Sequence, residues 1–82
     1  MKDLFQRGMA YMDGVGVEQD VEKGLGLILQ AAQQGYADAQ YFLGIYNFKM
    51  IQDIPTAVGW FQKAAQQGHE NARVVLEEAG LF

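Results

Sequence analysis

Few side chains in this sequence could take part in catalysis, and the only histidine, His69, is the first to consider. A catalytic histidine needs a nucleophile to activate, yet the chain has no serine or cysteine and a single threonine, Thr56. A metal site at His69 would need more imidazole or thiolate ligands, and the sequence supplies none. We interpret His69 as a surface-loop histidine, and we expect no catalytic residues, no metal site and no enzyme activity.

Two groups of carboxylates could in principle serve acid–base chemistry. Glu18, Asp20 and Glu22 precede a predicted helix, where an N-cap and favourable charge at the positive helix end explain them more simply. Glu77 and Glu78 fit a solvated helix face. Asp13, Glu18 and Asp20 could also be considered for calcium, but they lack the ligand spacing of calcium-binding loops. Both groups therefore predict structural roles.

The glycine pair Gly14 and Gly16 could suggest a phosphate-binding loop. No strand is predicted before it, no third glycine follows at Gln19, and the chain has no Gly-Lys-Ser/Thr sequence. Glycines are also the residues that accept positive φ in tight turns. The pair therefore predicts a turn between helices, and we expect no cofactor.

Length and composition limit the remaining classes. The 82 residues are enough for one domain, 1–82, and with 50% hydrophobic residues the chain is not intrinsically disordered. A net charge of −4 argues against nucleic acid or an anionic membrane as a partner and favours a basic or neutral one. No segment approaches the roughly 20 apolar residues of a membrane span, so we expect a cytoplasmic protein.

An internal repeat organises the chain. The segment Ala31-Ala32-Gln33-Gln34-Gly35 recurs as Ala64-Ala65-Gln66-Gln67-Gly68, at an offset of 33 residues. A period in the low thirties is typical of a solenoid built from helical pairs. Earlier in the chain the offset is 36 residues, because Gly8 aligns with Gly44, so the second unit is shorter between its two helices.

The spacing within each unit predicts helices separated by breakers. Asp20 and Asp53 suit N-caps, and Gly35 and Gly68 suit the left-handed positions that end helices. The predicted helices span 3–12, 21–34, 37–50, about 54–67 and 70–79. Glycines recur inside two of these helices at equivalent positions, 26 and 59, which predicts close helix approach there.

Two runs of spaced positions resemble one known family. The first run comprises Gly8, Tyr11, Gly14, Gly16, Val17, Asp20, Lys23, Ala31, Ala32, Gly35 and Ala39. The second comprises Leu43, Gly44, Asp53, Ala57, Trp60, Ala64, Ala65, Gly68 and Ala72. Together they resemble the Sel-one-like repeat (SLR), a relative of the tetratricopeptide repeat. Arg7 and Asn47 depart from the pattern, and the second unit lacks the Gly-x-Gly turn, which leaves the conformation around residues 50–53 open.

The resemblance implies an all-α solenoid of two antiparallel helical hairpins, 3–35 and 36–68, with a capping helix at 69–82. It also implies that the first helices of the units line a concave surface. Apolar residues left over from the predicted buried stripes gather on these helices, with Val74 and Phe82 as an extension. We predict a partner-binding groove, edged by Lys2 and Asp38, formed by Phe5, Met9, Met12, Tyr41, Ile45, Phe48, Lys49 and Val74.

Burial of these same side chains in the chain's own core stays open as the alternative. Since the family generally consists of adaptors, we expect a non-enzymatic module that binds a peptide, a helix or a second subunit. Two units are few for a repeat array, which predicts a homodimer or a constitutive heteromer. The alternatives are a small acidic inhibitor or immunity-type protein that neutralises an enzyme, and an oligomerising fragment of a larger repeat assembly.

Overall fold

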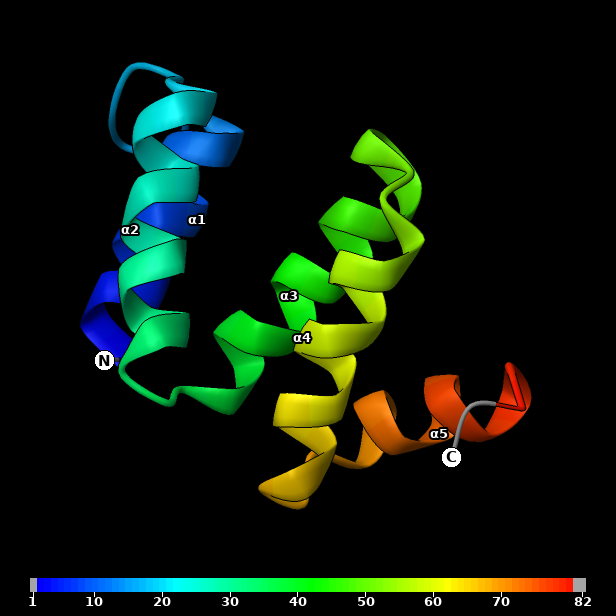
Figure 1. The fold of residues 1–82 in the computed structure, drawn as a ribbon. Helices are drawn as coiled ribbons and strands as arrows, with labels where there is room; N and C mark the ends of the chain where they lie inside the picture. The colour runs from blue at the N-terminus through cyan, green and yellow to red at the C-terminus, as the bar shows by residue number, and fades with distance from the viewer. Residues whose placement is uncertain (1, 81–82) are drawn as a thin grey trace.

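Two antiparallel helical hairpins followed by a single helix make up the protein (Figure 1). The computed structural model describes residues 2–80, and over that range it contains no strand. This arrangement confirms the predicted all-α fold class. None of the helices within 2–80 has both the length and the apolar character needed to cross a bilayer. The α-helices are α1 (Lys2–Asp13), α2 (Val21–Gln33), α3 (Ala37–Tyr46), α4 (Ile54–Gln66) and α5 (Glu70–Glu78).

The helix boundaries follow from short-range chemistry. Asp20 caps α2 by accepting a hydrogen bond from the Lys23 backbone N–H at 3.1 Å. Asp53 caps α4 in the same way, and it also accepts from the Thr56 hydroxyl at 2.7 Å. At the other ends, the glycines after α2 and α4 take left-handed φ angles of 95° and 86°, which let the chain leave each helix at once.

Equivalent positions of the repeat form two small cores. Alanines fill most of these positions, which lets neighbouring helices pack closely, while one larger side chain from α2 or α4 occupies the middle. The first core comprises Ile28, Ala31, Ala32, Ala39 and Leu43. The second comprises Ala57, Phe61, Ala64, Ala72 and Leu76. Each core therefore joins the second helix of one hairpin to the helix that follows it, which makes α5 the counterpart of α3.

Close helix contact occurs at other glycines than those predicted. An added Cβ at Gly24 of α2 would lie 2.6 Å from the Gly8 carbonyl oxygen of α1. In the second hairpin, a Cβ at Gly44 would lie 2.6 Å from the Phe61 ring. The prediction for positions 26 and 59 is wrong, because nothing lies within 4 Å of a Cβ at either position. Gly26 is exposed and Gly59 is partly buried, and at both positions a side chain would have room.

The turn between α3 and α4 differs from the predicted continuous helix to residue 50. The α-helix ends at Tyr46, and a π-helical turn follows over Asn47–Ile51. The Asn47 side-chain amide donates to the Leu43 carbonyl at 2.8 Å, so it competes with the backbone for that acceptor and favours the wider turn. Gln52 then adopts a left-handed φ of 63°, and the Asp53 N–H returns to the Asn47 carbonyl at 2.9 Å.

Candidate interaction groove

The first helices of successive repeats enclose a hollow of about 510 Å³, which we call the groove. α1 supplies one aromatic ring, α3 supplies the floor, and the start of α5 closes the far side. Lys49, from the π turn, stands at one end. The lining residues are Phe5, Asp38, Tyr41, Phe42, Ile45, Lys49, His69 and Asn71.

Aromatic rings join α1 to α3 across the groove. The Phe5 ring centre lies 6.3 Å from that of Phe42, edge to face, and 5.5 Å from that of Tyr36. Phe42 in turn stacks on Tyr46 at 6.3 Å along α3. Such pairs add to the stability that simple burial provides. Because Phe5 and Phe42 also pack against the first core, this part of the groove wall is held in place from behind.

Tyr41 forms the centre of the floor and belongs to both the groove and the second core. Its ring lies 5.8 Å from Phe61, on the core side. It also stacks on the His69 ring, with centres 4.7 Å apart and 25° between the planes. The packing leaves Tyr41 and Ile45 half-buried, so each presents only part of its surface to the groove.

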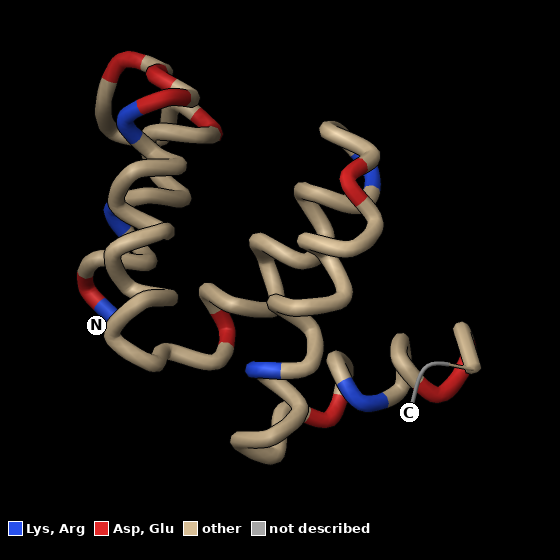
Figure 2. The backbone as a smooth tube through the Cα atoms, in the orientation of Figure 1, with Lys and Arg blue, Asp and Glu red and all other residues tan. Residues whose placement is uncertain are grey.

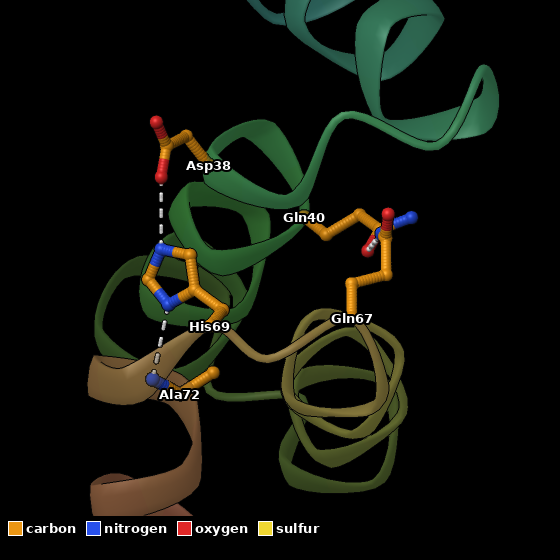
Figure 3. Close-up of polar contacts among 5 residues, drawn as sticks. All are labelled: Asp38, Gln40, Gln67, His69 and Ala72. Atoms are coloured by element: carbon orange, nitrogen blue, oxygen red, sulfur yellow. Dashed lines mark hydrogen bonds and ion pairs between the residues drawn. The ribbon is translucent and has the colours of Figure 1, made fainter.

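His69 connects two elements around the groove, which corrects the prediction of a surface-loop histidine. Its side chain is only 14% exposed. Nδ1 accepts the Ala72 backbone N–H at 3.2 Å and so caps α5, while Nε2 lies 2.9 Å from an Asp38 carboxylate oxygen (Figure 3). Since Nδ1 is an acceptor, the proton of the neutral ring lies on Nε2 and is donated to Asp38. The histidine thus couples the start of α5 to the start of α3.

A second polar connection uses glutamine side chains. Gln40 on α3 is 5% exposed, and its amide donates to the Ala32 carbonyl near the end of α2 at 3.0 Å. Its own carbonyl accepts from the Gln67 amide at 2.8 Å, at the end of α4 (Figure 3). Each half of the buried Gln40 amide therefore has a partner, as burial of a polar group requires. These hydrogen bonds join the end of α2 in the first hairpin to α3 and the end of α4 in the second hairpin. They therefore fix the position of one hairpin relative to the other.

Charge is unevenly distributed around the groove. Acidic segments gather at the α1–α2 turn (Figure 2). None of these acidic residues lines the groove. Within the groove, Asp38 and Lys49 provide one charge of each sign. Beside it, burial of the Tyr36 ring and the negative charge of Asp38 raise the pKa of that phenol above its ordinary value. Among residues 2–80, no three His, Asp or Glu side chains lie close enough together to hold a metal ion.

The structure brings together half of the residues predicted for partner binding. Phe5, Tyr41, Ile45 and Lys49 line the groove. Two predicted methionines, at positions 9 and 12, are half-buried against the first core instead. The remaining two predicted residues, at positions 48 and 74, are exposed and lie outside the lining, and the predicted extension to position 82 falls outside the described residues.

Sequence reasoning missed three of the lining residues. Phe42 follows Tyr41 on the same helix, and nothing in its spacing marked it as part of the floor. Asn71 and His69 enter the groove because α5 folds back beside α3, which is a long-range contact. The available signal was the repeat itself: at the 33-residue offset, Asn71 and His69 are the counterparts of Asp38 and Tyr36.

Comparison with known families places the two hairpins in one repeat class. Comparisons with curated proteins and with solved structures find no match. The family model of the Sel1 repeat matches residues 4–36 and 37–69, which take in α1–α2 and α3–α4 respectively. Because these two consecutive matches cover most of the chain, the protein belongs to the Sel1 repeat family.

Proposed function

We propose that this protein is a non-enzymatic interaction module that holds a segment of a partner protein in the groove. Sel1 repeats are generally protein–protein interaction modules. The observation that carries the proposal is the groove itself, where apolar side chains from α1 and α3 face a shared hollow with polar groups at its edge. Apolar hollows with a few convergent polar groups are the usual form of a binding site.

The size of the groove favours a short segment over a folded surface. A volume of about 510 Å³ accommodates one or two large apolar side chains. An amphipathic helix or an extended peptide supplies such anchors at regular spacing. At the edge, the Asn71 amide can donate to and accept from a peptide backbone, while Lys49 favours a carboxylate near one end.

The partner is therefore a peptide segment with one or two bulky apolar residues and an acidic residue beside them. The protein's overall net charge of −4 disfavours strongly acidic partners, so the single acidic residue is local to Lys49. In this proposal the pre-formed floor lowers the ordering cost of binding, since His69 and Gln40 already fix the helices that carry it.

A peptide-display selection against the immobilised protein tests the proposal. We expect the enriched peptides to share bulky apolar anchors. Addition of such a peptide to the isotope-labelled protein should shift the NMR signals of Phe42, Ile45 and Asn71. The variant Asn71→Arg places a long charged side chain over the hollow without removing core atoms. It should weaken peptide binding about tenfold, a change of roughly 1.4 kcal/mol.

The matched control is Gln62→Arg, which makes a similar change at an exposed position of α4 outside the groove. It should bind peptide like the parent chain, and both variants should keep the parent's melting temperature. Equal weakening by both variants, or NMR shifts that cluster away from the groove, would overturn the proposal.

A further inference from the structure

The two hairpin turns lie at the same end of the molecule and carry exposed apolar side chains that neither core uses (Figure 1). We call residues 13–23, the α1–α2 turn and the first turn of α2, the first tip, and residues 47–54 the second tip. Val15 is 68% exposed and Met50 is 70% exposed. The other exposed apolar residues of the tips are Val17, Val21, Phe48, Ile51 and Ile54.

The two tips differ in shape and charge. The first tip contains a hollow of about 500 Å³, bordered by the Tyr11 ring of α1, by the carboxylates of Glu18 and Asp20 and by Lys23. The second tip is a projecting π turn, where Lys49 and Met50 are exposed side by side. No ion pair within residues 2–80 involves Lys49. The first tip carries four carboxylates against one lysine, whereas in the second tip Lys49 is exposed and the Asp53 carboxylate is occupied in capping α4. An acidic tip and a projecting turn with an exposed lysine therefore lie on one chain.

The first tip is a formed surface rather than a loose loop. The Gln19 side-chain amide donates to the Met12 carbonyl at 2.7 Å, and the Asp20 N–H donates to the Tyr11 carbonyl at 2.9 Å. Lys23 lies over the Tyr11 ring, 4.7 Å from its centre. These bonds hold the walls of the hollow before any partner arrives, which lowers the cost of binding.

We propose that two copies of the chain associate about a twofold axis, with the second tip of each copy in the first-tip hollow of the other. The same contact then forms twice, as a closed dimer requires. Stable interfaces bury roughly 800 Å² on each partner, so an arrangement that engages both tips of each copy comes closer to that size than a contact through one tip. Met50 enters the hollow, and Lys49 pairs with Glu18 at its edge.

Charge selects this arrangement over the other occupants. A twofold axis that paired like with like would bring the acidic first tips of both copies together, which costs free energy. An anionic lipid surface would meet the same carboxylates beside the apolar residues, and the chain's net charge of −4 adds to that repulsion. The proposed dimer uses surfaces distinct from the groove, with Lys49 alone common to both.

Charge exchange between the tips tests the proposal by sedimentation equilibrium. Glu18→Lys and Lys49→Glu should each raise the dimer dissociation constant about tenfold, because each places like charges together twice. A mixture of the two variants should dimerise as well as the parent chain, since both contacts of the mixed dimer again pair opposite charges. Glu78→Lys on α5 is the matched control and should leave dimerisation unchanged.

Cross-linking gives a second, independent readout, because the sequence has no cysteine of its own. Val15→Cys mixed with Met50→Cys should form a disulfide between copies under mild oxidation, whereas each variant alone should not. Both positions are exposed, so circular dichroism should show unchanged folding.

Any of the following results would overturn the proposal. The first is a parent chain that stays monomeric at several hundred micromolar. The second is cross-linking of Met50→Cys with itself, which would indicate pairing between second tips. The third is a mixture of the charge variants that fails to restore dimerisation. The fourth is a monomer that binds anionic vesicles through the second tip.

Discussion

The two hairpins of this protein share one repeat, but the two helices of each hairpin contact each other in different ways. Between α1 and α2, glycines face each other, and the backbone of Gly8 contacts the backbone of Gly24. Between α3 and α4, a glycine on one helix receives the Phe61 ring from the other. Position 57, the counterpart of Gly24, holds alanine in the second hairpin.

The turns of the two hairpins also differ. The first turn has glycines at both left-handed positions, Gly14 and Gly16, whereas the second uses a π turn that ends with Gln52 at a left-handed φ. The repeat therefore constrains the buried positions more strictly than the way in which the helices meet or connect. Substitutions at the glycine contacts and in the turns test each of these differences.

The largest expected effect is at the backbone contact of the first hairpin. Gly24→Ala places a Cβ 2.6 Å from the Gly8 carbonyl and 3.0 Å from the Met12 backbone nitrogen, so α1 has to move away from α2. We expect the free energy of unfolding to fall by about 3 kcal/mol in urea denaturation.

The control lies two residues away on the same helix. Gly26→Ala meets nothing within 4 Å, so its higher helix propensity should raise stability by about 0.5 to 1 kcal/mol. Equal effects of the two substitutions would show that the helices do not meet at Gly24.

The second hairpin should tolerate its equivalent change better. Gly44→Ala meets a side-chain ring and not a backbone, and we expect a loss of about 2 kcal/mol. Phe61→Leu makes room for the added methyl group. The loss of stability in the double variant should therefore be smaller, by about 1 kcal/mol, than the sum of the losses in the two single variants. A double-mutant cycle in urea measures this coupling, and strict additivity would contradict the contact.

Adding a side chain at a left-handed position of the first turn and removing one from the second turn should change stability in opposite directions. Gly16→Ala has open space around it but a φ of 76°, so backbone strain alone should lower stability by about 1 kcal/mol. Gln52→Gly relieves the strain of a φ of 63° and should raise stability by about 0.5 kcal/mol. Thermal unfolding of both variants tests this pair, and a destabilised Gln52→Gly chain would contradict the left-handed turn.

The smallest effect concerns Tyr36 and His69, which occupy equivalent cap positions but act differently. Only His69 makes a side-chain cap bond. Burial and the charge of Asp38 raise the pKa of Tyr36 in the folded chain, so the unfolded chain loses this proton first. The contribution of Tyr36 to stability is complete below about pH 10 and is lost as the pH rises through the folded pKa.

Melting temperatures of the parent and Tyr36→Phe between pH 9 and 12 measure the difference. The parent should lose stability faster than the variant over this range. The phenylalanine variant keeps α3 intact, because Tyr36 makes no side-chain cap bond to lose. Parallel curves for the two chains would contradict the raised pKa.

Much of the fold could be predicted because its determinants are local. The N-caps at Asp20 and Asp53 and the glycines after α2 and α4 act within a few residues of the chain, so the predicted helix ends lie within a few residues of the observed ones. The π turn was not predicted, because Asn47 competes for a carbonyl only in the finished helix.

The groove was predicted only in part. Half of the predicted residues line it, since the helical period identified one face of α1 and of α3. It did not separate residues that face a neighbouring helix from residues that face the hollow, and so the two predicted methionines pack against the first core. Partner binding at the groove stays a prediction.

The sequence by itself determined the number of helices, most of their ends and their repeat, because N-caps, glycine breakers and the helical period act along a single helix. The tertiary structure alone decided which glycines touch, that His69 joins Asp38 to α5, and that both turns reach one end of the molecule. Those features depend on the angles at which neighbouring helices cross, and these angles arise from the combined packing of many side chains that no single segment of sequence contains.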